Sequence, residues 1–297
     1  MDFKEILPSE QILENEPMDK HTTFRVGGKV ALFLEIKKEE ELQQLLKLFY
    51  EEKQTYFVLG NGSNLLVSDR GYNGVILHLG PGFDEIEVEG NRITAQAGAM
   101  LSKVAFVAME HGLKGLEFAS GIPGSVGGGV MMNAGAYGGE MSQVVTDIKG
   151  FDRQGNPVRL DNESAQFGYR TSALKKNHMI ATEVVFELEP GNKEEIQNTV
   201  KELSEKRREK QPLEFPSAGS TFKRPEGYFA GKLIMDAGLR GYRVGDAQVS
   251  EKHCGFVVNR GNATASEIHQ LMLDVQEKVE EEFQVKLEPE VIRLGEF

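Results

Sequence analysis

The stretch GLEFASGIPGSVGGGVMMNAGAYGG, from Gly115 to Gly139, decides how the rest of the chain is interpreted. Glycine is dense in its second half, yet apolar residues stand between the glycines: Ile122, Val126, Val130, Met131 and Met132. A flexible linker would be polar throughout. Bare backbone held by buried apolar side chains can approach a ligand closely, and its successive N–H groups can form a concave anion site. The stretch therefore predicts a loop laid against a phosphorylated or otherwise extended cofactor. The alternative is a run of tight turns packed for structure alone.

A second glycine-containing turn follows a short apolar run. YFVLG (Tyr56 to Gly60) is typical of a buried strand, NGSN (Asn61 to Asn64) of a tight polar turn, and LLVSD of the strand that leaves it. This pattern is a second candidate for gripping a phosphate. It is not a dinucleotide-binding fingerprint, because the required glycine spacing is absent and no helix follows at once.

The composition is that of an ordinary globular protein. The chain has 297 residues, of which 39% are hydrophobic and 27% charged, and this length suggests about two domains. A net charge of −12 argues against broad nucleic-acid binding, which needs a basic face. The single cysteine, Cys254, excludes an internal disulfide and fits a reducing compartment. Neither a signal peptide nor a membrane-length apolar run is recognisable, so we expect a cytoplasmic protein with no membrane partner.

Periodicity predicts the elements around the two turns. Apolar alternation on both sides of Gly90 and Asn91 predicts a hairpin, and Thr264 with Glu267 forms a capping box at the start of a helix. A charged helix at 193–210 is interpreted as a solvated bridge between two domains. We expect helices at 39–54, 101–111, 193–210 and 264–279, and a closing strand at 285–295.

The charge balance is reversed between Ser217 and Arg243. Two acids in this segment stand against five basic residues: Lys223, Arg224, Lys232, Arg240 and Arg243. A basic segment interrupted by glycines predicts a second anion site, and an ordinary mixed surface is the alternative. The segment contains no P-loop. The six histidines of the chain lack metal-ligand spacing, so no metal is expected.

Six motifs, in this order, resemble the UDP-N-acetylenolpyruvylglucosamine reductase family, also called MurB, of bacterial peptidoglycan precursor synthesis. Together they cover the chain from His21 to its end. Any one could arise by chance, but six in order argue against an accidental match. The motifs are HTTFRVGG, VLGNGSNLLVSD, GLEFASGIPGSVGGGVMMNAGAYGGE, FGYRTSAL, PSAGSTFKRP and LEPEVIRLG.

The resemblance implies an α+β fold with an FAD-binding domain of the vanillyl-alcohol oxidase type. That domain would comprise two α+β subdomains, at 1–80 and 81–190. A C-terminal α+β domain at 191–297 would bind the substrate, and its last strand is a candidate to return to the first subdomain. The short span between Arg170 and Ser217 is similar to the shorter subtype of the family, which lacks a tyrosine-bearing loop over the substrate.

The family resemblance also implies the reaction. NADPH, as co-substrate, passes hydride to non-covalently bound FAD and leaves. The enolpyruvyl ether of UDP-N-acetylglucosamine then takes its place. The reduced flavin N5 delivers hydride to the vinyl methylene carbon, and a protein acid protonates the neighbouring carbon. The product is UDP-N-acetylmuramate.

The FAD contacts implied by the resemblance fall on the two glycine-containing segments. Asn61, Gly62, Ser63 and Asn64, flanked by Gly60 and Leu65, would donate hydrogen bonds to the pyrophosphate. The rest of the cofactor would be lined by Gly121, Ile122, Pro123, Gly124, Ser125, Gly127, Gly128, Asn133, Gly135 and Ala136.

Three residues match the family's catalytic positions. Arg170 would be the fixed cation that the developing enolate requires. Ser220 matches the proton donor and Glu290 the carboxylate that helps to hold or relay the proton, since a lone serine is a poor acid. Either of these two could deliver the proton. For the substrate, Lys232 and Arg240 are assigned to the diphosphate, and Arg224 and His253 to contacts near the sugar.

Two other functions remain open at this point. The first is a flavin-dependent oxidase on the same FAD scaffold, which would use O₂. Many such oxidases tether flavin through His or Cys, and the glycine-rich segments contain neither. The second is a non-catalytic nucleotide-sugar sensor, against which the presence of Arg170, Ser220 and Glu290 argues.

Overall fold

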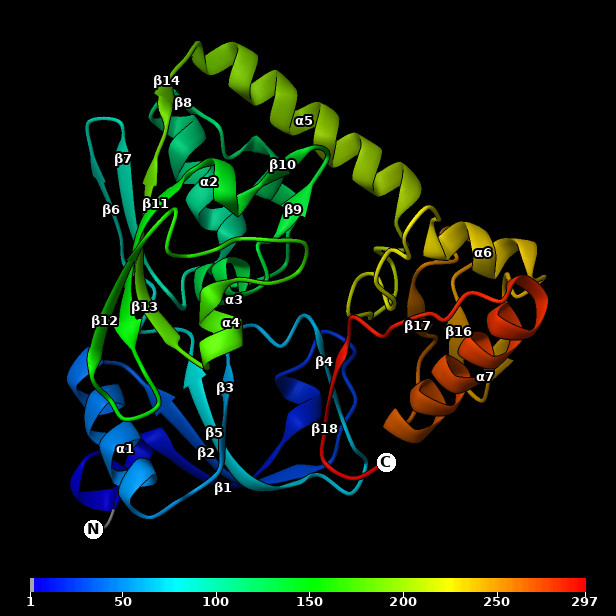
Figure 1. Cartoon of the computed structure of the whole chain (residues 1–297), viewed down its shortest axis with the longest axis horizontal. Coiled ribbons are helices and arrows are strands. Elements are labelled where there is room, and N and C mark those ends of the chain that lie inside the picture. Colours follow the sequence, from blue (N-terminus) through cyan, green and yellow to red (C-terminus); the bar gives the residue numbers. More distant parts are fainter. Residues whose placement is uncertain (1–2) are drawn as a thin grey trace. The chain divides into compact units, whose positions relative to one another are not determined.

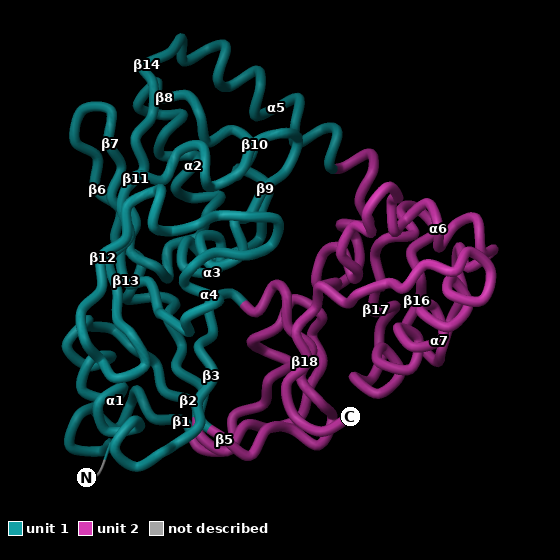
Figure 2. The backbone as a smooth tube through the Cα atoms, viewed as in Figure 1, with its two compact units in different colours: residues 1–13, 33–61, 75–207 teal, residues 14–32, 62–74, 208–297 magenta. Residues whose placement is uncertain are grey.

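The structure is a computed structural model that describes residues 3–297 (Figure 1). The chain forms two compact units, each assembled from three separate segments (Figure 2). Unit 1 comprises Met1–Leu13, Phe33–Asn61 and Val75–Arg207, and unit 2 comprises Glu14–Leu32, Gly62–Gly74 and Arg208–Phe297. The domain boundaries expected from the sequence, at 80 and 190, remain a prediction.

The largest sheet of unit 1 is five-stranded and antiparallel, in the order β12-β11-β13-β7-β6. The predicted hairpin is confirmed: β6 and β7 are joined through Gly90, whose φ of +62° lies in the left-handed region that glycine adopts without strain. The strands are β6 (Ile86–Glu89), β7 (Arg92–Gln96), β11 (Val145–Phe151), β12 (Pro157–Asp161) and β13 (Ile180–Glu187).

Two helices bury their apolar side chains against this sheet. α2 (Leu101–Glu110) and α3 (Val126–Met131) share a hydrophobic core with β7 and β13 (Figure 1). Val126 and Val130, two of the apolar residues between the glycines, are fully buried there. Burial of apolar side chains is the main favourable term in folding, so these residues fix the glycine-rich stretch on the sheet.

The remaining elements up to residue 210 include a second, four-stranded sheet in the order β1-β2-β5-β3, whose strands β1, β2 and β5 contain residues of both units. The predicted first helix is confirmed as α1, with Leu42, Leu45, Leu46 and Phe49 buried. The predicted charged helix is α5, whose buried residue is Ile196. These elements are β1 (Ile12–Pro17), β2 (Lys29–Ile36), α1 (Glu39–Glu51), β3 (Tyr56–Leu59), β5 (Tyr72–Leu79), β8 (Leu113–Lys114), β9 (Gly135–Ala136), β10 (Gly139–Glu140), α4 (Ala173–Asn177), β14 (Glu189–Pro190) and α5 (Lys193–Lys210).

Unit 2 is built around α7 (Ala265–Phe283) and a three-stranded antiparallel sheet in the order β15-β16-β17. The predicted capping box is present, with Glu267 N donating to Thr264 Oγ1 at 3.1 Å and Thr264 N donating to a Glu267 carboxylate oxygen at 3.0 Å. Asp69 adds a second cap, because its carboxylate accepts from Ala265 N at 2.8 Å and from Ser266 N at 2.7 Å. The remaining elements are β4 (Leu65–Val67), α6 (Ala230–Asp236), β15 (Arg243–Val244), β16 (Ala247–Val249), β17 (Val257–Asn259) and β18 (Ile292–Leu294).

The expected strand at 285–295 is much shorter in the structure. Only Ile292–Leu294 forms a strand, β18, which pairs parallel with β4. Before this strand, Pro289 forms an isolated antiparallel β-bridge with Phe222. The pairing nevertheless joins the C-terminal segment to Leu65–Val67.

Candidate active site

The glycine-rich stretch is partly helical. We expected a loop, but Val126–Met131 forms α3, with Ser125 as its N-cap. Ser125 Oγ accepts a 3.3 Å hydrogen bond from Gly128 N, and the N–H groups of Val126 and Gly127 donate to the carbonyls of Ala99 and Ala97 at 2.8 Å each. These bonds satisfy the first N–H groups of the helix, which otherwise lack partners. Glycines in this helix permit close packing: a Cβ on Gly127 would lie 3.0 Å from the Ala97 Cβ.

The two segments predicted to bind the cofactor meet within unit 1. Asn61 Nδ2 donates a 2.5 Å hydrogen bond to the Pro123 carbonyl oxygen. A Cβ on Gly60 would lie 2.2 Å from Ser125 Oγ, so only glycine fits there. The end of β3 and the start of α3 are therefore in direct contact, as expected if both face one ligand.

Several N–H groups at this junction have no acceptor among residues 3–297. They belong to Asn61, Gly124 and Ser125 in unit 1. N–H groups without a protein acceptor are available to donate to a ligand or to water. Other backbone groups here are bonded within the unit, since Ile122 N donates to the Ala119 carbonyl and the Gly124 carbonyl accepts from Leu101 N, at 3.0 Å each.

The segment after α3 positions Arg170. Asn133 Nδ2 donates to the Gly168 carbonyl at 3.3 Å, and Ser172 Oγ donates to the Met131 carbonyl at 3.0 Å. These bonds anchor a tight turn, closed between Gly168 and Thr171, that carries Arg170 at its tip. The Arg170 guanidinium carbon lies 5.4 Å from the centre of the Tyr169 ring.

Three non-glycine residues in this region have left-handed backbones. The φ angles are +42° at Asn133, +53° at Tyr137 and +54° at Arg170. Such conformations cost free energy and are typical of functional sites, where the surrounding structure enforces them. Between Asn133 and Tyr137, Gly135 and Ala136 form the short strand β9. A Cβ on Gly135 would lie 2.7 Å from the Gly139 carbonyl oxygen.

Arg207 is a residue that the sequence interpretation missed. It belongs to the charged helix α5, whose charges we had assigned to solvent. Its guanidinium packs on Gly121, where a Cβ would lie 2.7 Å from Nη1. Burial lowers the pKa of this guanidinium below its ordinary value, and nearby Tyr137 opposes that shift. The only sequence signal for this position was a run of three basic residues, 206–208, near the end of a helix.

Unit 2 holds the remainder of the NGSN turn. Gly62 has a φ of +59°, and a Cβ there would lie 1.9 Å from the His21 carbonyl oxygen, so glycine is required. The N–H groups of Gly62, Ser63 and Asn64 donate to no acceptor within the described part of the chain. Leu65 begins β4 and its side chain is buried.

Thr23 lies beside this turn. Its N–H donates to the Gly62 carbonyl at 3.3 Å. Its hydroxyl oxygen is the one buried side-chain polar atom without a hydrogen-bond partner among the described residues. A buried hydroxyl left unpaired is costly, so it indicates a missing partner.

These observations test whether the residues fit FAD. A pyrophosphate is an anion that accepts hydrogen bonds from N–H and hydroxyl groups, and both units offer such donors without acceptors. The donors are the N–H groups of Asn61, Gly124 and Ser125 in unit 1, and those of Gly62, Ser63 and Asn64 with the Thr23 hydroxyl in unit 2. The donors of each unit, taken by themselves, suit such an anion.

Ser220 and Glu290 are brought together within unit 2. Glu290 N donates to the carbonyl of Thr221, the residue after Ser220, at 2.9 Å. Thr221 is fully buried, and its Oγ1 accepts from Val257 N at 3.0 Å. Ser220 is exposed on this framework. Arg170 belongs to unit 1, and its convergence with these two residues remains a prediction.

The four residues assigned to the substrate surround α6 in unit 2. Arg224 lies over the Phe229 ring, 3.9 Å from its centre, at the start of the helix. Lys232, within the helix, forms a 2.6 Å ion pair with Asp236. Arg240 follows the helix and donates to the Glu251 carbonyl at 2.7 Å. Arg224, Lys232 and Arg240 therefore lie in or next to one helix.

His253 packs against the same helix. Its Cε1 lies 3.2 Å from where a Cβ on Gly231 would be. Its Nδ1 accepts a 3.1 Å hydrogen bond from Gly255 N. Partial burial lowers the pKa of the ring below the ordinary histidine value. A neutral imidazole with Nε2–H as donor can contact a sugar hydroxyl.

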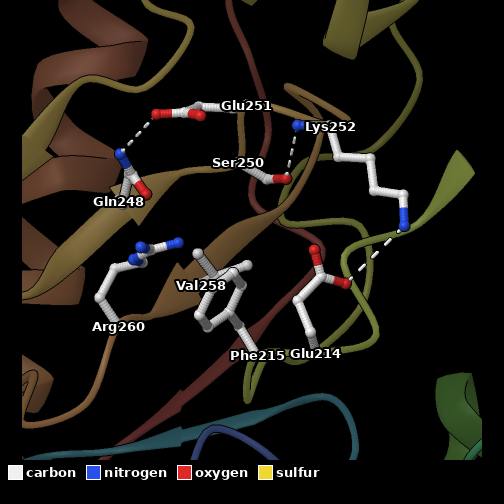
Figure 3. A pocket seen from close by; sticks show the side chains of 8 residues that line it. All are labelled: Glu214, Phe215, Gln248, Ser250, Glu251, Lys252, Val258 and Arg260. Atoms are coloured by element: carbon white, nitrogen blue, oxygen red, sulfur yellow. Dashed lines mark hydrogen bonds and ion pairs between the residues drawn. The ribbon is translucent and has the colours of Figure 1, made fainter.

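A separate pocket of about 300 Å³ opens in unit 2 (Figure 3). None of the predicted site residues lines it. Three of its charged side chains have partners within the pocket. Glu214 forms an ion pair with Lys252 at 3.8 Å, and the Arg260 guanidinium carbon lies 4.0 Å from the centre of the Phe215 ring. The lining residues are Glu214, Phe215, Gln248, Ser250, Glu251, Lys252, Val258 and Arg260.

Two family models match the chain. Residues 30–161 match an FAD binding domain, and residues 211–294 match the C-terminal domain of UDP-N-acetylenolpyruvoylglucosamine reductase. No helix within residues 3–297 has the length and apolar character needed to cross a membrane.

Known proteins similar to this chain agree with these matches. A UDP-N-acetylenolpyruvoylglucosamine reductase of Clostridioides difficile is 50% identical, over 98% of this chain and 96% of that protein. One of Agathobacter rectalis is 52% identical, over 99% and 97%. The crystal structure of the Thermus caldophilus reductase (MurB) has a TM-score of 0.81 and 36% identity, over 96% of this chain and 98% of that one.

A more distant structure shares part of the fold. Phl p 4.0202, a glucose dehydrogenase, has a TM-score of 0.52 at 13% identity, over 64% of this chain and 44% of that one. The predicted α+β fold of the vanillyl-alcohol oxidase type is thus confirmed. With half of its residues identical to those of named relatives over nearly its whole length, the chain belongs to the UDP-N-acetylenolpyruvoylglucosamine reductase (MurB) family.

Proposed function

We propose that this chain reduces the enolpyruvyl ether of UDP-N-acetylglucosamine to UDP-N-acetylmuramate, with NADPH as reductant and non-covalent FAD as cofactor. Family membership supports the reaction. The observation that supports its assignment to this chain's residues is the 2.9 Å bond from Glu290 N to Thr221 O, because it joins the segments that carry Ser220 and Glu290.

FAD, when bound, would supply hydride transfer between NADPH and the substrate. The chain's part is to hold it and to exclude competing reactions. The unpaired N–H groups of Asn61, Gly62, Ser63 and Asn64, with those of Gly124 and Ser125, would bind its pyrophosphate. The bare backbone of Gly121 to Gly128, with Asn133, Gly135 and Ala136, would leave room for the rest of the cofactor.

Arg170 is assigned to the substrate's carboxylate and to the negative charge that builds beside it. A fixed cation stabilises an enolate most when it is held in place before reaction. The anchored turn at Gly168–Thr171 and the left-handed backbone of Arg170 provide such a fixed position.

The proton is assigned to Ser220 and Glu290. A serine hydroxyl is a weak acid, so it needs a nearby group that can hold or replace its proton. Glu290 on the adjoining segment can do so. The Ser220 hydroxyl would donate to the substrate carbon, and the Glu290 carboxyl would return the proton.

Lys232 and Arg240 are assigned to the diphosphate, and Arg224 and His253 to the region of the sugar. Lys232 and Arg240 lie within and just after α6, where a single bound anion could engage both. The Lys232 ion pair with Asp236 would open to do so, at low cost because exposed pairs contribute little.

The chain's environment is proposed to be the cytoplasm, where NADPH is available, and no nucleic-acid partner is proposed. The net charge of −12 would repel a polyanion, and the single cysteine is compatible with a reducing compartment.

Product analysis in the absence of oxygen tests the proposed reaction. Protein loaded with FAD should oxidise NADPH and convert the UDP-sugar enolpyruvyl ether into a product that is heavier than this ether by two hydrogens. An oxidase would consume reductant only when oxygen is admitted. A sensor would bind the sugar nucleotide without forming product. Acid denaturation should release all yellow colour, as expected for non-covalent FAD.

A further inference from the structure

The side chain of Asn64 binds the C-terminal segment of the chain. Its Nδ2 donates a 3.1 Å hydrogen bond to the Glu290 carbonyl oxygen. Its backbone carbonyl accepts from Ile292 N at 3.0 Å. Two hydrogen bonds of Asn64 thus hold residues 290 and 292 of the C-terminal segment. Asn64 and this segment both belong to unit 2.

Glu290 is therefore held from two sides. Asn64 binds its carbonyl, and Thr221 binds its N–H. Thr221 is itself fixed, since its N–H donates to the Gly255 carbonyl at 2.9 Å and its buried Oγ1 accepts from Val257 N. Immediately afterwards Ile292 enters β18, which pairs with Leu65 of β4.

The same residue also belongs to the turn that would bind the pyrophosphate. The N–H groups of Gly62, Ser63 and Asn64 donate to no acceptor within residues 3–297. One face of the turn therefore presents donors to an anion, while the side chain and carbonyl of Asn64 hold the segment that carries Glu290.

We propose that Asn64 is a positioning residue that couples occupancy of the phosphate-binding turn to the placement of Glu290. This inference rests on the proposed function, because it takes the anion to be the FAD pyrophosphate. FAD that orders the turn also orders residues 290–292. By linkage, the factor by which FAD favours the ordered segment is also the factor by which the ordered segment increases the affinity for FAD.

Hydrogen exchange measured residue by residue on the full chain tests the coupling without any turnover. In the wild type, FAD should increase protection of the Glu290 and Ile292 amides. In Asn64→Ala, this FAD-induced gain should shrink about threefold to tenfold, the equilibrium equivalent of one side-chain hydrogen bond. Asn64→Ser is a second variant, with a shorter side chain that keeps a donor group but not its reach.

Two matched controls separate coupling from general loosening. Asn61→Ala removes the other asparagine side chain of the turn, which donates to the Pro123 carbonyl, and should weaken FAD binding while leaving the gain at saturating FAD intact. Gln276→Ala removes a 2.7 Å bond from Nε2 to the Leu287 carbonyl on the same C-terminal segment. It should lower protection in both states equally.

The outcomes divide cleanly. A full FAD-induced gain in both Asn64 variants would overturn the role of Asn64. FAD binding with no gain even in the wild type would overturn the coupling and leave the proposed function standing. Absence of FAD binding to the folded wild type would overturn both.

Discussion

The N–H of Glu290 donates a 2.9 Å hydrogen bond to the carbonyl of Thr221, and this bond sets Glu290 beside the segment that presents Ser220. The two segments come from distant parts of the sequence and meet as a single bridging contact rather than as a regular ladder. Both lie in unit 2, with the buried Thr221 fixing the spacing.

Ser220→Ala removes the proposed proton donor. Reduction of bound flavin by NADPH should survive, whereas reoxidation by the enolpyruvyl substrate should slow about 10²- to 10⁴-fold, as for loss of a general acid. Single-turnover absorbance traces measure both steps. Ser217→Ala, on the same segment, is the matched control and should leave both steps close to normal. Equal slowing of both steps in Ser220→Ala would make Ser220 a binding residue.

Arg170→Gly separates function from stability. Glycine accepts the φ of +54° without strain, so the free energy of unfolding should fall by no more than about 1 kcal/mol, and could rise. Loss of the guanidinium should lower kcat about 10²- to 10³-fold. Urea unfolding and steady-state rates give the two numbers. Gln284→Gly, at the left-handed C-cap of α7, should match the stability effect with normal kcat. Normal turnover in Arg170→Gly would remove the assigned role.

Gly60→Ala should weaken FAD binding. The new Cβ would lie 2.2 Å from Ser125 Oγ and 3.1 Å from Ser125 Cβ, so the two cofactor segments must separate. Ser125→Ala in the same chain removes the closer clash and should restore part of the affinity, although it also costs the cap of α3, about 1 kcal/mol. Fluorescence titration of apoprotein with FAD measures both variants. Unchanged affinity in Gly60→Ala would show that this junction does not face the cofactor.

Thr23→Val tests the unpaired hydroxyl. Valine keeps the shape of the side chain and removes a buried polar atom that has no partner, so the apoprotein should be stabilised by about 1 kcal/mol or more. FAD affinity should fall, because a donor to the cofactor is lost. Thr22→Val is the contrast, since its hydroxyl already donates to the Val26 carbonyl at 3.1 Å and its removal should destabilise the apoprotein. A more stable variant with unchanged FAD affinity would leave the hydroxyl without a ligand role.

His253 predicts a pH dependence of stability. Burial lowers its pKa in the folded state, whereas the unfolded chain has a pKa of about 6.5. The unfolded state therefore binds more protons between the two values, and stability rises with pH there. The contribution is complete above the unfolded pKa and is lost as pH falls through the folded one. His253→Gln should flatten this part of the profile, measured by urea unfolding. His269 also has a lowered pKa, from burial and from nearby Arg293, so His269→Gln should remove a separate part of the pH dependence of stability. An unchanged slope in His253→Gln would contradict the prediction.

More of the fold than of the candidate site could be predicted from the sequence. Periodic segments such as the helices α1, α5 and α7 were predictable because each buries or exposes one face, and the Thr264–Glu267 capping box is a local signal. The helix α3 was missed because glycine has a low helix propensity, and here tertiary packing of Val126 and Val130 overrides it. The closing strand was overestimated because its first half forms an isolated bridge, between Pro289 and Phe222, and the regular strand begins at Ile292.

Site residues were predictable where a motif carried them and not where packing created them. Asn61 and Gly60 could be assigned to a turn, but their contact with Pro123 and Ser125 depends on how β3 meets α3. Arg207 could not be distinguished from its charged neighbours, since its contact with the loop depends on the absence of a side chain at Gly121. Thr23 is recognisable only once the burial of its hydroxyl is known.

The two half-reactions, followed in one anaerobic stopped-flow trace of FAD-loaded protein, give the most direct test of the proposed function. NADPH should bleach the flavin absorption band, and subsequent addition of the UDP-sugar enolpyruvyl ether should restore it without oxygen. Recovery that requires oxygen, or a bleached flavin that the UDP-sugar cannot reoxidise, would contradict the assignment of this chain as the reductase.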